Sequence, residues 1–288
     1  MNWVFLVLAS AFFLAFRTIL TKKISTNHSA LPVLFYISLL STLSIVFFHT
    51  NMFFSFPLHL YGLIIIKAFV ISIAWISIFE VLKHVDVSIV APLKNMSPLF
   101  LLVLSMLFLG ERVSAINYAG IFLVVFSSYA LELQSFRNFL EPLRFFKSRY
   151  FILIIISLIG NSISAVLDKV LLQTLDYLTV MFIFYLSISC WFLFFLCIRK
   201  EISSLSIFRQ SHTRILIIAL TFFALVSDFF YFMAVAIPGT FIILIMPLRR
   251  LDSLISTILG GRIFKESHLV YKSIVCLLLI LASVLLVL

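Results

Sequence analysis

Apolar runs long enough to cross a lipid bilayer follow one another along almost the whole chain. A spanning helix needs about 20 mostly apolar residues. Because backbone polar groups cannot go unsatisfied in hydrocarbon, each run is expected to be a helix. The chain is therefore predicted to be an all-α, polytopic membrane protein with ten transmembrane helices. The runs are 3–20, 31–49, 60–79, 86–109, 115–133, 150–170, 177–198, 214–235, 240–261 and 269–288.

The composition agrees with a membrane protein and excludes several other classes. Charged residues make up 11% of the chain, against roughly 25% in soluble domains. The chain has a net charge of +10. In a membrane protein, an excess of Lys and Arg more often marks cytoplasmic loops than a nucleic-acid-binding surface, so no nucleic-acid partner is expected. The cysteines lie in apolar runs and no histidines have metal-ligand spacing, so no metal site is expected. No cofactor is expected either. The expected partners are a lipid bilayer and a small-molecule substrate.

Two segments, 91–111 and 246–266, share a pattern that indicates an internal repeat. Pro92-Leu93-Lys94 matches Pro247-Leu248-Arg249, and Glu111 and Glu266 follow at identical spacing. The repeat predicts a five-helix half at 1–133, a connecting loop at 134–149 and a second five-helix half at 150–288. Because five is odd, the second half enters the membrane with opposite polarity. Inverted repeats of this kind are common in secondary carriers, whose substrate site lies near the midplane between the halves.

On these features the chain resembles the drug/metabolite transporter superfamily, and within it the ten-helix EamA-type carriers. The resemblance rests on the five-plus-five layout and on the ending of each half: a Pro-bearing apolar helix, a Glu and a last apolar helix. One departure is Lys265, which stands where the first repeat has Gly110. The resemblance implies a carrier and not an enzyme, in a multi-pass arrangement in the inner cell membrane. Family members move amino acids, nucleotide sugars, sugar phosphates, drugs and other metabolites, so it does not identify the substrate.

Charged residues inside spanning segments are costly and are functional candidates by default. Lys94 and Arg249 occupy equivalent places in the two repeats, and Arg250 follows directly. A polar stripe at i, i+3, i+4 and i+7 starts at Arg249, on one helical face. A proline precedes each cation, removes a backbone donor and can kink the helix as a hinge. The candidate substrate-binding residues are Lys94, Arg249, Arg250, Asp252, Ser253, Ser256, Asp228, Asn161, Trp75 and Tyr231, and the hinges are Pro92 and Pro247.

The arginines have a structural alternative. Arg249 or Arg250 can pair with Asp252 or Asp228 to hold helices together instead of contacting substrate. Four further charged residues lie near the expected helix ends, where long side chains can snorkel to the interface, so a structural role is predicted for them. They are Arg17, Lys67, Glu80 and Asp168.

The repeated glutamates are predicted to have a helix-start role. Glu111 and Glu266 each open the next apolar run. A carboxylate there complements the positive end of the helix dipole.

The cations predict the charge of the substrate. Arginine binds carboxylate or phosphate oxygens bidentately, and lysine acts as a point charge. We therefore expect a secondary transporter for an anionic or zwitterionic metabolite: an organic acid, an amino acid or a phosphorylated compound. One alternative is an exporter of cationic or amphipathic drugs, which would need Asp228 to be unpaired. A membrane-embedded lipid-modifying enzyme is a third class, against which the short loops without a catalytic constellation argue. Transport direction, coupling ion and the choice between monomer and homodimer stay open.

The loop charges also bear on orientation. Nearly all loop Lys and Arg residues follow odd-numbered apolar runs. The positive-inside rule then predicts that these loops are cytoplasmic and that both termini lie outside. Relatives in the superfamily are thought to keep both termini inside, so the two arguments conflict.

Overall fold

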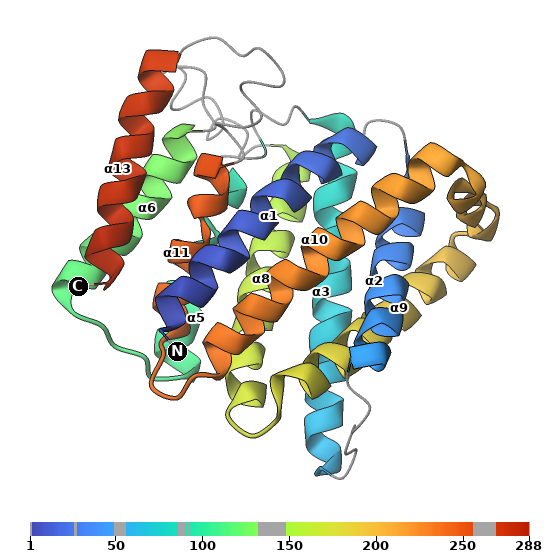
Figure 1. Ribbon diagram of the computed structural model, residues 1–288, viewed down its shortest axis with the longest axis horizontal. Helices are drawn as coiled ribbons and strands as arrows, with labels where there is room; N and C mark the ends of the chain where they lie inside the picture. Colours follow the sequence, from blue (N-terminus) through green and yellow to red (C-terminus); the bar gives the residue numbers. More distant parts are fainter. Residues whose placement is uncertain are drawn as a thin grey trace.

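In the part of the chain that it describes, the computed structural model consists of helices joined by turns and loops (Figure 1). The described residues are 2–25, 28–48, 56–85, 90, 93–131, 148–255 and 269–287. The helices are α1 (Trp3–Ser25), α2 (Ala30–Phe48), α3 (Leu58–His84), α5 (Ser97–Phe108), α6 (Ala115–Leu131), α8 (Arg149–Leu172), α9 (Tyr177–Ile198), α10 (Ser211–Ala236), α11 (Ile242–Arg249) and α13 (Leu269–Val287), with a 3-10 helix, η3 (Ile202–Arg209). The predicted all-α class is confirmed.

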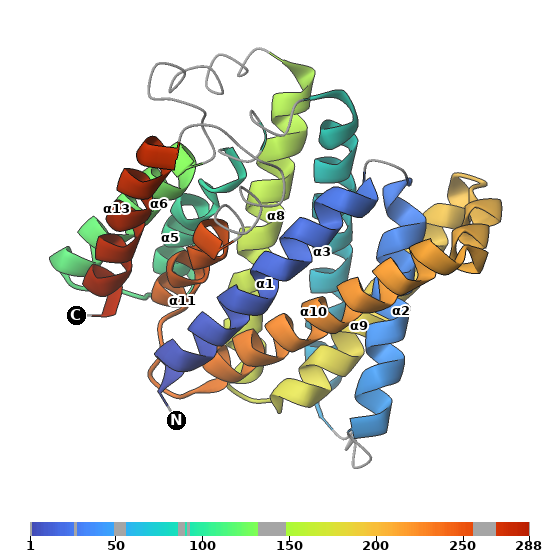
Figure 2. The same cartoon turned by 45° about the horizontal axis from the view of Figure 1, so that its top comes forward.

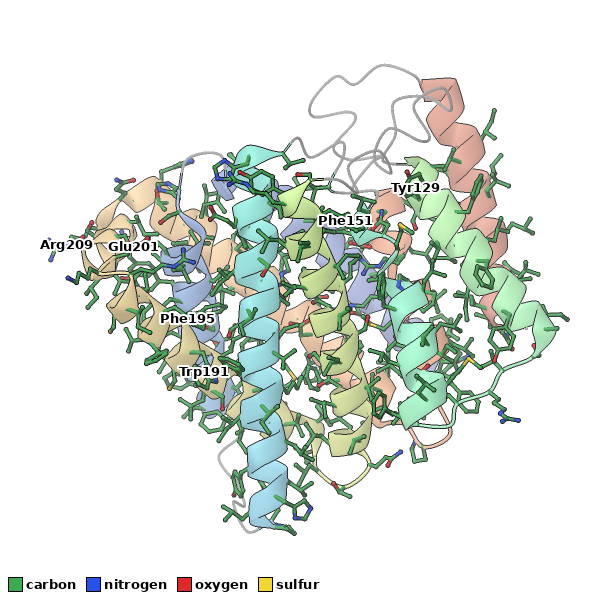
Figure 3. All side chains as sticks on the ribbon, turned by 180° about the vertical axis from the view of Figure 1, so that it is seen from behind. Tyr129, Phe151, Trp191, Phe195, Glu201 and Arg209 are labelled. Atoms are coloured by element: carbon green, nitrogen blue, oxygen red, sulfur yellow. The ribbon has the colours of Figure 1, made fainter. Side chains whose placement is uncertain are left out.

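Several of these helices can cross a bilayer. Within the described ranges, α1, α2, α3, α8, α9 and α10 are long and apolar enough to do so, whereas the apolar helices 97–108, 115–130 and 274–287 are shorter. Large apolar side chains such as Phe47, Leu107 and Phe222 are exposed on the outside. Figure 3 shows Trp191 and Phe195 along the outer side of α9. Such a surface is compatible with lipid and not with water, and the chain is a multi-pass integral membrane protein.

Two helices that were predicted to be continuous are interrupted. The expected helix 86–109 has a turn at Asn95 and Met96 before α5 begins. The expected helix 240–261 ends as α11 at Arg249, turns at Arg250 and is helical again over 251–255. Pro247 lies inside α11, one turn before this break, and its missing N–H weakens the hydrogen-bond ladder there. The polar stretch after α9 also contains η3, which was not predicted.

Helices from the two ends of the chain pack side by side. α1 lies along α10, α3 along α8, α2 along α9 and α6 along α13 (Figures 1 and 2). Small residues allow close approach, as is usual between membrane helices. A Cβ on Gly160 of α8 would lie 2.9 Å from the Cβ of Ala74 on α3. Ser10 and Ser227 exchange hydrogen bonds across α1 and α10, from each Oγ to the other residue's carbonyl oxygen, at 2.8 and 2.9 Å.

The molecule has two distinct ends. Both termini lie at one end, together with the segments 109–114 and 237–241; we call this the termini end (Figure 1). At the other end, the Tyr36 hydroxyl on α2 donates to the Leu205 carbonyl of η3 at 2.8 Å. Glu201 and Arg209 lie at this second end, beyond α9 (Figure 3). The functional groups described next lie between the two.

Candidate functional site

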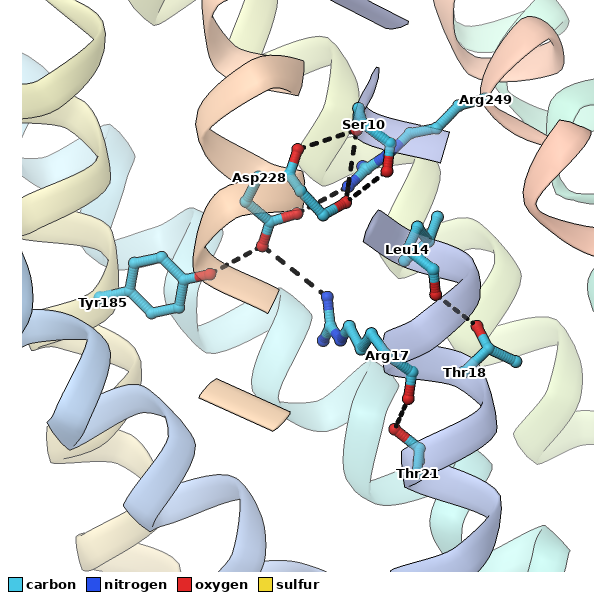
Figure 4. A network of polar contacts seen from close by, with 9 residues as sticks. Ser10, Leu14, Arg17, Thr18, Thr21, Tyr185, Asp228 and Arg249 are labelled. Carbon is cyan, nitrogen blue, oxygen red and sulfur yellow. Dashed lines mark hydrogen bonds and ion pairs between the residues drawn. The ribbon is translucent and has the colours of Figure 1, made fainter. Parts of the chain in front are cut away.

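The carboxylate of Asp228 on α10 is the centre of a polar network inside the helix bundle (Figure 4). Its Oδ1 accepts a hydrogen bond from Nη2 of Arg249 at 2.7 Å, and its Oδ2 accepts one from the hydroxyl of Tyr185 on α9 at 2.7 Å. Nη1 of Arg17 on α1 lies 3.7 Å from Oδ2. Two guanidinium groups from different helices therefore share one carboxylate.

Arg249 has donor capacity beyond this pair. Its Nη2 also donates to Oγ of Ser227 at 3.0 Å, and its guanidinium carbon lies 4.5 Å from the ring centroid of Tyr231. Its Nε is buried and has no hydrogen-bond partner among the described residues. A buried N–H without a partner is uncommon and costly.

Arg17 is held by an aromatic side chain. Its guanidinium carbon lies 5.3 Å from the ring centroid of Trp75 on α3, a cation–π distance. Trp75 in turn stacks on Phe192 of α9, with ring centroids 6.3 Å apart. Arg17 approaches Oδ2 of Asp228, the oxygen that also binds Tyr185, whereas Arg249 binds Oδ1 (Figure 4).

A second ion pair lies beside the first. Lys67 on α3 pairs with Asp168 on α8, and Lys67 is 1% exposed. The Lys67 ammonium also lies 3.8 Å from the ring centroid of Phe184 and 4.8 Å from that of Phe232. The Tyr231 hydroxyl donates to Asp168 Oδ2 at 3.3 Å. Since Tyr231 also lies under Arg249, it connects the two ion pairs.

The connected network carries an excess of positive charge when every group is ionised. Its cations are Arg17, Lys67 and Arg249, and its carboxylates are Asp168 and Asp228. Isolated charges are expensive in a membrane interior. An anionic ligand would balance the excess.

The structure brings four of the predicted site residues together: Arg249, Asp228, Tyr231 and Trp75. Arg249 makes the pair with Asp228 that was considered as its structural alternative. Pro247 lies within α11, two residues before Arg249.

The other predicted site residues lie apart from this network or beyond the described ranges. Arg250 donates to Oγ of Ser97 on α5, and the Asn161 amide donates to the Ser157 carbonyl of its own helix at 2.6 Å. Asp252 and Ser253 are buried. Oδ1 of Asp252 has no hydrogen-bond partner in the part of the chain described. The cations that act on Asp252 electrostatically are Arg250, Arg249 and, more weakly, the exposed Lys94. Ser256, Pro92 and Glu266 lie outside the described residues.

Three of the residues that were predicted to lie near helix ends or to snorkel are paired inside the bundle, although Asp168 does lie near the end of α8. Arg17, Lys67 and Asp168 form the two ion pairs, so the prediction that they snorkel was wrong. α3 begins at Leu58 and runs to His84, which places Lys67 well inside the helix. Glu80 does lie near the end of α3, where its Oε1 is 3.3 Å from Nε2 of His84.

Two members of the network were missed altogether. Tyr185 and Ser227 bind Asp228 and Arg249. Both lie within apolar runs, and neither has a neighbour spacing that distinguishes it. A buried Tyr hydroxyl needs a partner, which is the only signal that the sequence offered for Tyr185.

Glu111 stabilises a helix start, although not the one predicted. Its Oε1 and Oε2 accept hydrogen bonds from the amides of Ile242 at 2.9 Å and Ile243 at 3.0 Å, at the start of α11. The start of α6 is capped by Ser114 and Asn117, whose side chains each accept from the other's amide. Glu111 is therefore not needed at α6.

Lys169 of α8 lies near the Glu111 carboxylate. Its Nζ donates to the Val235 carbonyl at 3.2 Å and to Oγ1 of Thr240 at 3.1 Å. Burial raises the pKa of Glu111, while the two amides and the positive charge of Lys169 act in the opposite direction.

Comparison with known proteins agrees with this architecture. Residues 1–132 match the sequence profile described as the EamA-like transporter family. The first part of the chain, residues 1–132, is therefore similar to the EamA-like transporter family. A search of curated protein sequences finds no match.

A solved crystal structure has the same fold. It superposes with a TM-score of 0.74 at 14% identity, over 98% of this chain and 95% of its own. EamA-like proteins are membrane transporters of the drug/metabolite type, so the match indicates a membrane transporter with a small-molecule substrate.

Proposed function

We propose that this EamA-like protein is a secondary transporter for a small metabolite that carries an anionic group, and that it acts by alternating access in the inner cell membrane. The substrate class comprises organic acids, amino acids in their zwitterionic form and phosphorylated compounds. The observation that carries the proposal is Arg249, whose buried Nε has no partner among the described residues while its Nη2 is held by Asp228.

The geometry around Asp228 supports the binding of a second anion. In the absence of substrate, Asp228 pairs with both Arg17 and Arg249, and its single negative charge balances only one of them. A substrate carboxylate or phosphate that approaches Nε of Arg249 supplies the second anion for these two guanidinium groups. Guanidinium groups bind both kinds of oxyanion in a fork geometry. The internal pair therefore keeps the empty site stable, and the substrate completes the charge balance.

Asp252 extends the proposal to zwitterions. It lies three residues after Arg249 and is buried, and its Oδ1 lacks a hydrogen-bond partner within the described ranges. An ammonium group on the substrate would hydrogen-bond this oxygen while the substrate carboxylate binds Arg249, and it would do so in competition with the cations Arg250, Arg249 and Lys94, which already act on Asp252. A cationic drug is disfavoured because both carboxylates of the network already pair with cations.

The packing of the helices supports two related halves, 1–133 and 150–288. The repeat relates α1 to α8 and α3 to α10, so the packing of α1 on α10 corresponds to the packing of α8 on α3. Rocking of the halves about a central site is the usual mechanism of such carriers. The end opposite the termini carries Arg199, Lys200 and Arg209, and the positive-inside rule favours a cytoplasmic position for it.

A thermal-shift screen of the purified protein tests the substrate class. Ligand that binds only the native state raises its apparent stability by mass action. The proposal expects stabilisation by carboxylates, amino acids or phosphorylated metabolites, and its loss in Arg249→Ala. Stabilisation by cationic drugs alone would contradict it.

A further inference from the structure

The start of α11 has no cap of its own. The preceding residue is Phe241, whose side chain cannot accept a hydrogen bond. The amides of Leu244 and Ile245 reach the Phe241 carbonyl at 3.1 and 3.3 Å. The first amides of a helix have no partner within it, and here the remaining two, of Ile242 and Ile243, are bound by the Glu111 carboxylate.

This cap comes from a distant segment. Glu111 lies between α5 and α6, whereas α11 lies more than a hundred residues later in the chain. Glu111 is 6% exposed, so the contact is shielded from water. Charge-assisted hydrogen bonds to backbone amides are stronger than neutral ones, and two of them fix both the position and the direction of the helix start.

The other end of the same helix carries Arg249. From Ile243 to Arg249 the helix rises about 9 Å, at about 1.5 Å per residue. The helix is continuous from Ile242 to Arg249, and Pro247 lies in its last turn. Any shift at Ile242 and Ile243 therefore reaches the guanidinium group that binds Asp228.

We propose that Glu111 is a latch: it ties the first half of the chain to α11 at the termini end, and it thereby holds Arg249 in the network. Glu111 is a positioning residue and contacts no substrate. The functional part of the inference rests on the proposed role of Arg249. In the alternating-access cycle the latch must open when the halves part at this end.

Other charged groups near the latch act differently. Lys169 faces the Glu111 carboxylate from α8 but binds the carbonyl of Val235 and the hydroxyl of Thr240. Arg112 follows Glu111 in the chain and is exposed. Neither binds an amide of α11, so the tie itself depends on Glu111.

Amide hydrogen exchange tests the latch without any substrate. In Glu111→Ala, the amides of Ile242 and Ile243 lose both acceptors, and their protection should fall about tenfold or more, since a hydrogen bond to a charged group contributes about 1.5–3 kcal/mol. Asp176→Ala is the matched control. Asp176 caps α9 through Leu178 and Thr179, so its loss should affect those amides and leave α11 unchanged.

The link to Arg249 is tested by its reactivity toward phenylglyoxal, followed by peptide mass spectrometry. Glu111→Ala should raise the modification rate of Arg249 about tenfold while Arg17, on α1, stays close to its wild-type rate. If Glu111→Ala does not fold, Glu111→Gln, which keeps one acceptor oxygen, should give a smaller change in the same direction.

Three results would overturn the latch: unchanged protection of Ile242 and Ile243, equal rises at Arg17 and Arg249, or the same effects in Asp176→Ala. None of these readouts uses substrate. A failed transport or ligand screen with intact exchange results would therefore reject the proposed function and leave the latch standing.

Discussion

Asp228→Asn should destabilise the empty protein, because it leaves two guanidinium groups without their shared anion. Removing one partner of a buried ion pair costs about 3–5 kcal/mol. The lower end applies here for two reasons. Arg17 is 3.7 Å from the carboxylate, beyond hydrogen-bond range, and the amide oxygen that the substitution introduces can still accept from the Tyr185 hydroxyl. We therefore expect a loss of about 3 kcal/mol.

Thermal unfolding of the purified, ligand-free protein measures this loss. At about 2–4 °C per kcal/mol for a chain of this size class, the apparent melting temperature should fall by roughly 6–12 °C. Asp176→Asn is the matched control, because it also removes one negative charge but keeps an effective helix cap, so its shift should be small. A bound anionic metabolite should restore more stability to Asp228→Asn than to the wild type, since this variant leaves one more positive charge for the ligand to balance. Equal melting temperatures for Asp228→Asn and Asp176→Asn would refute the shared-carboxylate reasoning.

Three further perturbations test other contacts. Lys67→Met should lower the free energy of unfolding by about 3 kcal/mol because it leaves Asp168 unpaired, and adding Asp168→Asn should recover most of this loss. If the double variant instead shows the sum of the two single losses in a denaturation experiment, the two residues do not form a buried pair. Gly160→Ala should cost about 1–3 kcal/mol through overpacking against Ala74, and Ala74→Gly should relieve it; equal melting of Gly160→Ala and the wild type would show that α3 and α8 are less closely packed. Burial raises the pKa of Glu111 in the folded state above its value in the unfolded chain. The stability that this pKa difference contributes is fully present below the unfolded-state pKa and is lost as pH rises through the folded-state pKa. The wild type should lose stability across that window relative to Glu111→Gln, and parallel pH profiles would contradict this.

The overall architecture was readable from the sequence because lipid imposes a simple rule. Long apolar runs must be helices, so runs such as 31–49 and 177–198 correspond closely to α2 and α9. The helix breaks at Met96 and after Arg249 were not predicted. Pro92 and Pro247, a few residues before these breaks, were predicted only to be hinges. Hydropathy reports the length of an apolar run and is insensitive to a single turn inside it.

The site was only partly readable. Arg249 and Asp228 stood out because a charge in an apolar run is rare. Lys67 and Asp168 were misassigned because their pairing is a tertiary contact between α3 and α8, and position in a run does not reveal it. Tyr185 and Ser227 gave no usable signal, since hydroxyl groups are common in membrane helices. Glu111 was correctly associated with a helix start, but its partner α11 depends on the packing of distant segments.

The measurement that tests the central claim most directly is solute uptake into proteoliposomes. Labelled representatives of the carboxylate, amino-acid, phosphorylated and cationic classes would be compared for wild type, Arg249→Lys and Arg249→Ala. The account predicts saturable, exchangeable uptake of at least one anionic or zwitterionic solute, reduced by roughly tenfold or more in Arg249→Ala, which loses a charge-assisted contact of about 1.5–3 kcal/mol. Uptake of such a solute that is unchanged in Arg249→Ala, or uptake confined to cations, would contradict it.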